Sequence, residues 1–276
     1  MSGTLYVVGT PIGNLGDMSP RALETLENVD FIAAEDTRVA LKLLNHFGIK
    51  KQLVSYHEHN RFEKGESILS RLVAGESCAI VTDAGMPAIS DPGEDLVKLC
   101  HEHSVKVESV PGPCAFSTAM AISGMPAGRF TFEGFLSMNK PSRKKHLEEV
   151  KNERRTMIFY EAPHKLPATL KDMAAAWGNR NIAIVREITK IHEEVIRTTL
   201  FDAAEKYADG TLKGEIVLII EGAPESTQEE YTLEQAVSMA LDSVKSGMSR
   251  SDAAKTAAKE TGFKKGDIYK AMEVSE

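Results

Sequence analysis

The stretch AIVTDAGMPAISDPG, residues 79–93, decides the fold. It begins with apolar residues typical of a buried strand, reaches Asp83 at the end of that strand, and continues into a loop with two glycines and two prolines. Such residues fix the backbone and allow it to approach a ligand closely. Asp83 could accept a hydrogen bond from a ribose or an amine, or it could cap a turn. Asp91 precedes an expected helix, so we expect it to cap that helix.

The same order, an apolar strand followed by a helix, repeats on both sides of this stretch. We expect strands at 5–8, 31–34, 53–56, 78–82 and 105–110, and helices at 20–28, 64–74, 91–102 and 114–123. Nearly continuous apolar strands that alternate with helices predict an α/β fold with a mostly parallel sheet covered on both faces.

The pattern changes after Gly124, and we expect a second α/β lobe with a mixed sheet. Its expected strands are 130–135, 157–160, 181–188 and 215–220, and its expected helices are 165–176 and 201–208. We therefore divide the chain into an N-terminal α/β domain (1–120), a second α/β domain (121–224) and a C-terminal helical region (225–276).

The C-terminal region reads as a polar linker at 226–230 followed by helices at 233–245, 249–259 and 264–274. Ser249 is the expected N-cap of the middle helix, and Gly262 is expected to end it. Two short helices around a glycine-containing turn are typical of a helix-turn-helix.

Composition limits the class of protein. A chain of 276 residues with 42% apolar residues can fill large cores, and no run approaches the roughly 20 apolar residues that span a bilayer. The N-terminus reads as a strand rather than a targeting segment, and the three cysteines are widely spaced. We therefore expect a cytoplasmic protein without disulfides and without a membrane partner. The net charge of −7 does not exclude nucleic acid, because basic residues can be locally concentrated.

Two further turns follow strands of the first lobe. The segment 9–15, GTPIGNL, suits a ligand loop beyond a strand end, although an ordinary tight turn explains it equally well. It matches neither the dinucleotide fingerprint nor the phosphate-binding loop. The segment 110–117, VPGPCAFS, opens a helix whose free amides suit a carboxylate or a small polar ligand. Cys114 has no base partner in sequence, so we do not expect a nucleophile there.

The second lobe places charged residues at its strand ends, in 159–165, 186–194 and 213–215. Each could simply be solvated. The histidine pairs at 57–59 and 101–103 lack a third ligand at recognisable spacing, so no metal site is expected.

Together these segments resemble the tetrapyrrole methylase superfamily, and within it the branch that modifies small-subunit ribosomal RNA. The matching stretches run in order through the chain: 9–15, 34–38, 55–60, 81–93, 110–112, 159–164, 186–190 and 213–217. Relatives that modify tetrapyrroles carry Gly-Asp-Pro where this chain has Thr-Asp-Ala-Gly-Met-Pro at 82–87. That departure weakens a porphyrinoid substrate but not the cofactor.

The resemblance implies a two-lobed fold that binds S-adenosylmethionine, a class III methyltransferase, as a homodimer. It implies methylation of the ribose 2′-hydroxyl of a decoding-centre cytidine (cytidine-1402) in 16S rRNA, within free RNA or the assembled small ribosomal subunit. The cofactor positions carried over are Pro11, Asp83, Ala84, Gly85, Met86, Ile89, Cys114, Ala115, Tyr160, Arg186, Lys213, Gly214 and Glu215.

Removal of the 2′-hydroxyl proton calls for a positioned base. Glu187 and Lys190 lie in the charged strand-end segment of the second lobe, and we take them as the first catalytic residues to test. Asp36 and His57 lie in corresponding segments of the first lobe. Glu187 and Lys190 could equally be salt-bridge partners.

RNA affinity should come from local basic patches, because neutralising phosphates drives such binding. Residues 139–155 and residues 245–270 each carry seven basic against three acidic residues, the reverse of the whole-chain balance. The residues predicted to contact RNA are Lys140, Arg143, Lys144, Lys145, Arg250, Lys255, Lys264 and Lys265. Either patch could also be a solvated helix face.

Three other functions remain open. Methylation of a tetrapyrrole would leave the basic helical tail without a use, and a non-catalytic RNA-binding protein could retain the nucleotide pocket. An oxidoreductase is disfavoured because the dinucleotide fingerprint is missing.

Overall fold

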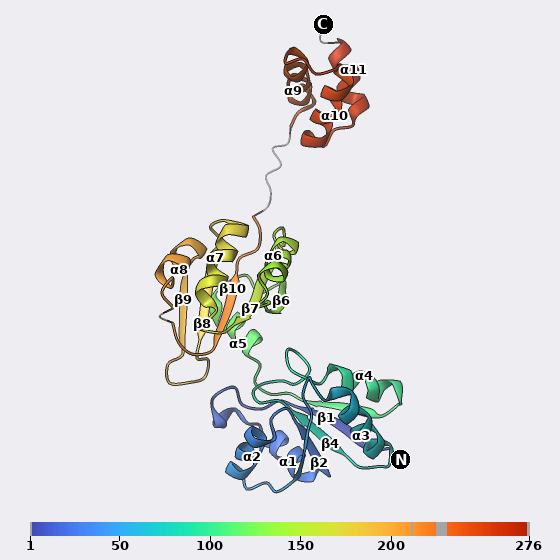
Figure 1. The fold of residues 1–276 in the computed structure, drawn as a ribbon, viewed down its shortest axis with the longest axis vertical. Helices are drawn as coiled ribbons and strands as arrows, with labels where there is room; N and C mark the ends of the chain where they lie inside the picture. Colours follow the sequence, from blue (N-terminus) through green and yellow to red (C-terminus); the bar gives the residue numbers. More distant parts are fainter. Residues whose placement is uncertain (1, 211, 225–230, 275–276) are drawn as a thin grey trace. The chain divides into compact units, whose positions relative to one another are not determined.

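The computed structural model describes residues 2–210, 212–224 and 231–274, and the linker expected at 226–230 lies outside them. The chain divides into two compact units, residues 1–223 and 224–276. Within the described residues, the first unit contains two five-stranded sheets, each with its own helices (Figure 1). We call these two parts of the first unit the first lobe and the second lobe.

The first lobe is a parallel sheet with the strand order β3-β2-β4-β1-β5. Its strands are β1 (Thr4–Val8), β2 (Phe31–Ala34), β3 (Gln52–Ser55), β4 (Cys78–Val81) and β5 (Lys106–Val110). Its helices are α1 (Pro20–Asn28), α2 (Thr37–His46), α3 (Arg61–Val73) and α4 (Glu94–Glu102). One face packs against α1 and α2 and the other against α3 and α4.

The apolar strands explain this double cover. All four residues of β2 and of β4 are buried, and successive residues face opposite sides of the sheet. Phe31 and Ile80 belong to the cluster with α3 and α4, whereas Ile32 and Val81 belong to the cluster with α1 and α2. A strand buried on both faces cannot alternate with polar residues, which is why these segments read as continuous apolar runs.

The second lobe is a mixed sheet with the order β6-β7-β10-β8-β9. Its strands are β6 (Phe130–Phe135), β7 (Thr156–Glu161), β8 (Asn181–Arg186), β9 (Glu194–Thr199) and β10 (Ile216–Ile220). Only β6 and β7 are parallel, and the other neighbours are antiparallel. The expected fold class, a parallel lobe followed by a mixed one, is confirmed.

Helices cover the two faces of this second sheet unequally. On one face lie α6 (Lys140–Glu149), α7 (Leu166–Trp177) and α8 (Leu200–Lys206). The other face packs against α5 (Ala115–Ser123) and against Ile12 from the first lobe. Arg197 on β9 secures α5, because its guanidinium donates to the carbonyls of Ile122 and Ser123 at the end of that helix. The face near Ile12 is therefore the one that meets the first lobe.

The structure adds elements that the sequence pattern did not reveal. Helix α2 and strand β9 were not expected, and the basic segment at 140–149 forms α6. Strand β9 lies at the edge of its sheet and is only partly buried, so it lacks the apolar run of a central strand. A short 3-10 turn, η1 (Leu15–Asp17), follows the first loop.

The second compact unit contains α9 (Leu233–Lys245), α10 (Arg250–Thr261) and α11 (Lys265–Val274) around a core rich in alanine. The hydroxyl of Ser249 accepts a hydrogen bond from the amide of Asp252 and caps α10, as predicted. Gly262 ends α10 in the left-handed conformation, with φ of 77°, also as predicted. None of the helices in the described part of the chain combines the length and apolar character needed to cross a bilayer.

Candidate functional site

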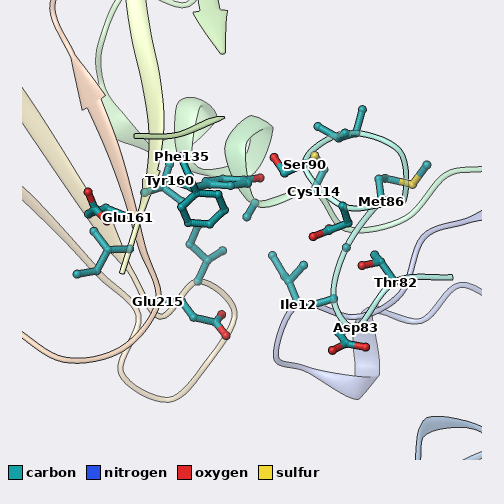
Figure 2. Close-up of a pocket in the computed structure, with 18 of the residues that line it drawn as sticks. Ile12, Thr82, Asp83, Met86, Ser90, Cys114, Phe135, Tyr160, Glu161 and Glu215 are labelled. Atoms are coloured by element: carbon teal, nitrogen blue, oxygen red, sulfur yellow. The ribbon is translucent and has the colours of Figure 1, made fainter. Parts of the chain in front are cut away.

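A cavity of about 470 Å³ opens between the two lobes (Figure 2). It lies beyond the carboxyl ends of the first lobe's strands, where ligands bind in open α/β sheets. The lining residues of the first lobe are Ile12, Glu35, Thr82, Asp83, Ala84, Gly85, Met86, Ile89, Ser90, Asp91, Cys114 and Ala115. Those of the second lobe are Phe135, Tyr160, Glu161, Ala162, Pro163, Ile188, Glu215, Ile216 and Val217.

The first-lobe wall is built from three loops that bond directly to one another. Thr10 and Gly85 exchange backbone hydrogen bonds of 2.9 and 3.1 Å, which join the loops after β1 and β4. The backbones of Gly9 and Gly112 pack directly against each other and join the loops after β1 and β5. The contact is so close that a Cβ on Gly9 would stand 2.7 Å from the Cα of Gly112. Only two glycines permit such a contact, so this wall is formed largely by rigid backbone.

Three carboxylates gather on this wall. They are Glu35, Asp83 and Asp91. The hydroxyl of Thr82 donates to Glu35 at 2.7 Å and is also a hydrogen-bond partner of Asp91. The backbone amide of Asp36 donates to Asp83 at 3.2 Å. Loss of hydration and then repulsion from Glu35 raise the pKa of both Asp83 and Asp91. A cationic ligand would relieve that repulsion.

Asp91 does not cap α4, contrary to our expectation. The helix begins at Glu94, and its N-cap is Gly93 with φ of 150°. A residue with a Cβ rarely adopts this conformation, and the chain turns sharply there before the helix starts. The carboxylate of Asp91 lines the cavity instead.

The second-lobe wall is aromatic. Tyr160 on β7 contacts Phe132 and Phe135, with ring centroids 5.0 and 5.3 Å apart. Figure 2 shows Tyr160 and Phe135 side by side at the cavity. The hydroxyl of Tyr160 accepts a hydrogen bond of 3.1 Å from the amide of Phe116 in the first turn of α5. Burial, with a smaller contribution from Cys114, raises the pKa of Tyr160 to about 12, so it remains a neutral phenol.

Glu187 and Lys190 form a charged clasp beside the cavity. The ammonium of Lys190 lies 3.1 Å from Glu187 and 3.0 Å from Glu215, and Glu187 also accepts from the amide of Glu215. The aliphatic part of Lys190 covers Gly13, where a Cβ would come within 2.6 Å of it. This clasp joins the second lobe to the first loop of the first lobe.

The electrostatics of the clasp do not suit proton abstraction. The amide of Glu215 and then the ammonium of Lys190 lower the pKa of Glu187. Burial opposes the charge on Lys190, but hydrogen bonds to Glu215 and Glu187 outweigh it and raise the pKa. Neither side chain lines the cavity, so the geometry favours the salt-bridge alternative for both.

Most of the cofactor positions expected from the resemblance lie on the cavity wall. Those that line it are Asp83, Ala84, Gly85, Met86, Ile89, Cys114, Ala115, Tyr160 and Glu215. Pro11, Arg186, Lys213 and Gly214 do not. Arg186 donates to the carbonyls of Lys213 and His192 and pairs with Glu194, so it supports the loops around the clasp.

Several lining residues lie within the stretches that resemble the family but were not assigned to the cofactor site one by one. These are Ile12, Glu35, Thr82, Ser90, Glu161, Ala162, Pro163, Ile188, Ile216 and Val217, with Asp91 assigned to another role, and Phe135 lies outside those stretches. The strand-end rule could have found Glu35 and Thr82, because each directly follows a buried strand. No sequence pattern pointed to Phe135, because a bulge at Glu133 and Gly134 in β6 decides which face of the sheet its side chain lies on.

The predicted RNA-contacting residues fall on α6 and on the second unit. Lys140 and Lys144 are exposed and have no ion-pair partner among the described residues. Arg143 is paired with Asp172 at 2.7 Å, and Lys145 lies 3.7 Å from Glu149. In the second unit, Lys255, Lys264 and Lys265 are exposed, and Arg250 is partly buried. Lys140 and Lys144 are thus the α6 residues best placed to meet a phosphate.

None of the three cysteines forms a disulfide. All three are free, and burial raises the pKa of Cys78 to about 12 and that of Cys100 to about 11. In the described parts of the chain, no three His, Cys, Asp or Glu side chains are grouped so that they could hold a metal ion.

Comparison with known proteins identifies relatives over nearly the whole chain. Residues 4–204 match the model of the tetrapyrrole (corrin/porphyrin) methylases. The ribosomal RNA small subunit methyltransferase I of Halalkalibacterium halodurans is 46% identical over 97% of this chain and 93% of its own. The protein of the same name from Synechocystis sp. is 44% identical over 97% of this chain and 96% of its own.

Solved structures share the fold at low identity. A diphthine synthase superposes with a TM-score of 0.59 at 13% identity, covering 80% of this chain and 90% of its own. A uroporphyrin-III-C-methyltransferase from Thermus thermophilus gives 0.56 at 16%, covering 79% and 94%. These likenesses concern the fold alone. Because the family model matches most of the sequence, and close relatives match nearly all of it, the chain belongs to the tetrapyrrole methylase family, in its ribosomal RNA small subunit methyltransferase I branch.

Proposed function

We propose that this enzyme transfers a methyl group from S-adenosylmethionine to a ribose 2′-hydroxyl of small-subunit ribosomal RNA. The observation that carries the proposal is the cavity whose first-lobe wall bears three carboxylates and whose second-lobe wall is aromatic. The name shared by the close relatives supplies the class of RNA. We further propose a decoding-centre cytidine as the target, the assembled small subunit as the substrate and a homodimer as the working form.

The residues present fit a cationic methyl donor. Burial and then repulsion from Glu35 raise the pKa of Asp83 and of Asp91, so a cation placed among these carboxylates would be stabilised. A sulfonium or an α-ammonium group supplies one. The volume of about 470 Å³ is within the usual range for small-molecule sites. Gly85 lines the cavity, where a residue without a side chain allows a ligand to approach the backbone closely.

S-adenosylmethionine carries its methyl group on a positively charged sulfur, which activates the carbon for in-line displacement. The chain's own residues supply position and charge. The rigid first-lobe loops hold the donor side, and orientation of two reactants can contribute about 7–11 kcal/mol. Tyr160 stays neutral and fixed by the amide of Phe116, so it adds shape without charge. Asp83 and Asp91 face the cavity with raised pKa values, which brings them closer to the range useful for accepting a proton.

Phosphate contacts are proposed for Lys140, Lys144 and Lys145 of α6 and for Arg250, Lys255, Lys264 and Lys265 of the second unit. Deleting residues 226–276 should weaken binding to small subunits about 10-fold or more, because each lost phosphate contact removes counterion release. Donor binding should be unchanged, since every cavity-lining residue precedes that segment. Equal affinity for the particles before and after truncation would remove the tail from RNA recognition.

The deciding experiment maps ribose methylation in small-subunit RNA with and without the gene, and then repeats the reaction with purified components. Labelled donor and small subunits from the deletion strain should give label at one 2′-oxygen. Label on a tetrapyrrole instead would favour the other branch of the family. Binding of RNA with no transfer of label would make the protein a non-catalytic binder.

A further inference from the structure

We propose that Phe135 is the stacking platform for the nucleobase of the nucleotide that is methylated. The inference rests on the proposed function and assigns a specificity-determining role to a side chain of the second lobe. Phe135 lines the cavity, and 56% of its surface is exposed, so one part of the ring packs and the rest is open. Large apolar side chains that are half exposed at the mouth of a cavity are a feature of ligand sites.

A bulge in β6 aims this ring at the cavity. Phe132 pairs with Ile158 and Phe135 pairs with Tyr160, while Glu133 and Gly134 occupy the place of one residue between them. Gly134 adopts φ of 65°, a left-handed value that favours glycine. With regular alternation, residues 132 and 135 would point to opposite faces. The bulge places both on the face of Ile158 and Tyr160, which is the face directed to the first lobe.

The bulge also accounts for Glu133. Its carboxylate lies 3.0 Å from Nε2 of His146 on α6, which covers the opposite face of the sheet. Glu133 and Phe135 are two residues apart and would share a face in a regular strand. Here they point to opposite sides, Glu133 toward the helix layer and Phe135 toward the cavity. The bulge in β6 therefore directs an aromatic ring outward, and packing alone does not explain this exposed position.

The neighbouring rings hold the platform in place. Phe135 contacts Tyr160, Tyr160 contacts Phe132, and Phe132 stacks on Phe116 with ring centroids 4.7 Å apart. This chain of rings runs from buried α5 to the exposed Phe135. An aromatic side chain that cannot turn away loses little entropy when a planar ligand stacks on it.

Charge distinguishes the nucleobase from the methyl donor as the partner of this ring. The carboxylates that suit the cationic donor belong to the first lobe, whereas Phe135 lies on the other wall. The two carboxylates of that wall already have partners within the protein: Glu215 pairs with Lys190, and Glu161 accepts from Thr169 and from its neighbour's amide. Within ten residues after Phe135 come the exposed Met138 and the unpaired cations Lys140 and Lys144. The short connection between Phe135, at the end of β6, and Lys140, at the start of α6, allows a polyanionic strand held at the start of this helix to reach Phe135 with one of its bases. Stacking of bases on aromatic rings is a usual mode of single-stranded RNA recognition.

The test compares Phe135→Ala, Phe135→Leu and Phe135→Trp with wild type, using small subunits that lack the modification. We expect the KM for the particles to rise about 5- to 100-fold in F135A, which corresponds to the usual loss of one stacked base. F135L should resemble F135A because it keeps apolar bulk but has no π face, and F135W should restore the wild-type KM. The dissociation constant of S-adenosylmethionine should stay within about twofold in all three.

Phe201→Ala is the matched control, since Phe201 is 52% exposed on α8 at the layer away from the cavity. Its KM should equal that of wild type. An unchanged KM in F135A, or a normal KM in F135L, would overturn the inference. So would a loss of donor binding in F135A, which would assign the ring to the donor, or a change of oligomeric state by light scattering, which would assign it to a second copy. If wild type itself methylates no RNA, the proposed function fails first, and that outcome is separate from these.

Discussion

The two walls of the cavity are built by different means. The first-lobe wall consists of loops after parallel strands, locked by backbone bonds and a glycine contact, and it carries the carboxylates Glu35, Asp83 and Asp91. The second-lobe wall consists of side chains, chiefly the rings of Phe135 and Tyr160, and the ion-paired clasp of Lys190 lies beside it. A backbone wall fixes one ligand in one position. A wall of side chains on a mixed sheet can be altered residue by residue while the fold is kept.

The carboxylates that suit a cationic donor lie on the first wall, and the exposed ring that suits a nucleobase lies on the second. We infer that donor recognition belongs to the first lobe and acceptor recognition to the second, and the following experiments test that division.

The largest effect should come from neutralising the carboxylate cluster. In Glu35→Gln/Asp91→Asn, the dissociation constant of S-adenosylmethionine should rise about 100-fold, or roughly 3 kcal/mol, because two charges within about 4 Å interact by up to about 4 kcal/mol near a protein surface. Calorimetry checks this. The demethylated product of S-adenosylmethionine lacks the sulfonium charge, so its affinity should fall less. Glu24→Gln, an exposed carboxylate on α1, is the control. Equal losses for both ligands would refute recognition of the sulfonium.

The second effect concerns the glycine contact. In Gly112→Ala the new Cβ would stand 2.8 Å from the backbone of Gly9, so two of the three loops must separate. Forced overpacking typically costs about 1–3 kcal/mol, and we expect that loss in the free energy of unfolding, measured with urea. Donor affinity should fall as well. Gly128→Ala is matched, because nothing lies within 4 Å of its Cβ position and its φ is ordinary. A stable Gly112→Ala protein with normal donor binding would show that this wall is not rigid.

The sequence predicted the first wall better than the second for a physical reason. Strands such as 78–81 are buried on both faces, so the apolar run, the strand end and the following loop can be read directly. Asp83, Gly85 and Met86 were found in this way, with the family resemblance assigning them to the cofactor. Glu35 directly follows β2, a strand buried on both faces in the same way.

The second wall depends on register and on non-local contacts. The bulge at residues 133 and 134 reverses the face of Phe135, and no periodicity in a single strand reveals it. Likewise, the charges of Glu187 and Lys190 were visible, but their pairing with each other and with Glu215 depends on the loop conformation. Glu187 and Thr189 have φ of 52° and 65°, values that few residues other than glycine adopt. Sequence alone therefore gave residue types here without their geometry.

The third experiment separates a clasp from a base. In Lys190→Ala and in Glu187→Ala, single-turnover methylation should fall less than about 10-fold, because both side chains lie outside the cavity wall and Lys190 is held protonated. Removing a true general base costs about 10²–10⁴-fold. Rapid quench with saturating donor and RNA measures the step directly. A loss of about 10²–10⁴-fold in Glu187→Ala, with the rate restored in Glu187→Asp, would show that the clasp takes part in catalysis.

The fourth experiment uses pH. The pKa values of Asp83 and Asp91 are raised above 3.8 in the folded protein, so the folded state binds more protons than the unfolded state as pH falls. These two groups therefore add stability as pH falls through their folded values, the reverse of a salt-bridged aspartate. Donor affinity should move the other way and weaken up to about 10-fold over one pH unit below those values. Titration by calorimetry from pH 7 downward checks both signs. A donor affinity that follows an ordinary carboxyl pKa would contradict the cluster.

The smallest effect should come from the hydrogen bond between the lobes. The hydroxyl of Thr189 donates to Asp17 at 2.6 Å, across the junction that Lys190 also covers. A hydrogen bond to a charged group contributes about 1.5–3 kcal/mol when buried, and less here because both residues are partly exposed. A double-mutant cycle with Thr189→Val and Asp17→Asn should therefore give a coupling of about 0.5–1 kcal/mol.

Measuring the cycle twice, on the free energy of unfolding and on the KM for RNA, sharpens the division between the walls. If coupling appears in stability alone, the junction only joins the lobes. If it appears in the KM, the second lobe must be set against the first before RNA is accepted, and acceptor recognition would depend on both walls.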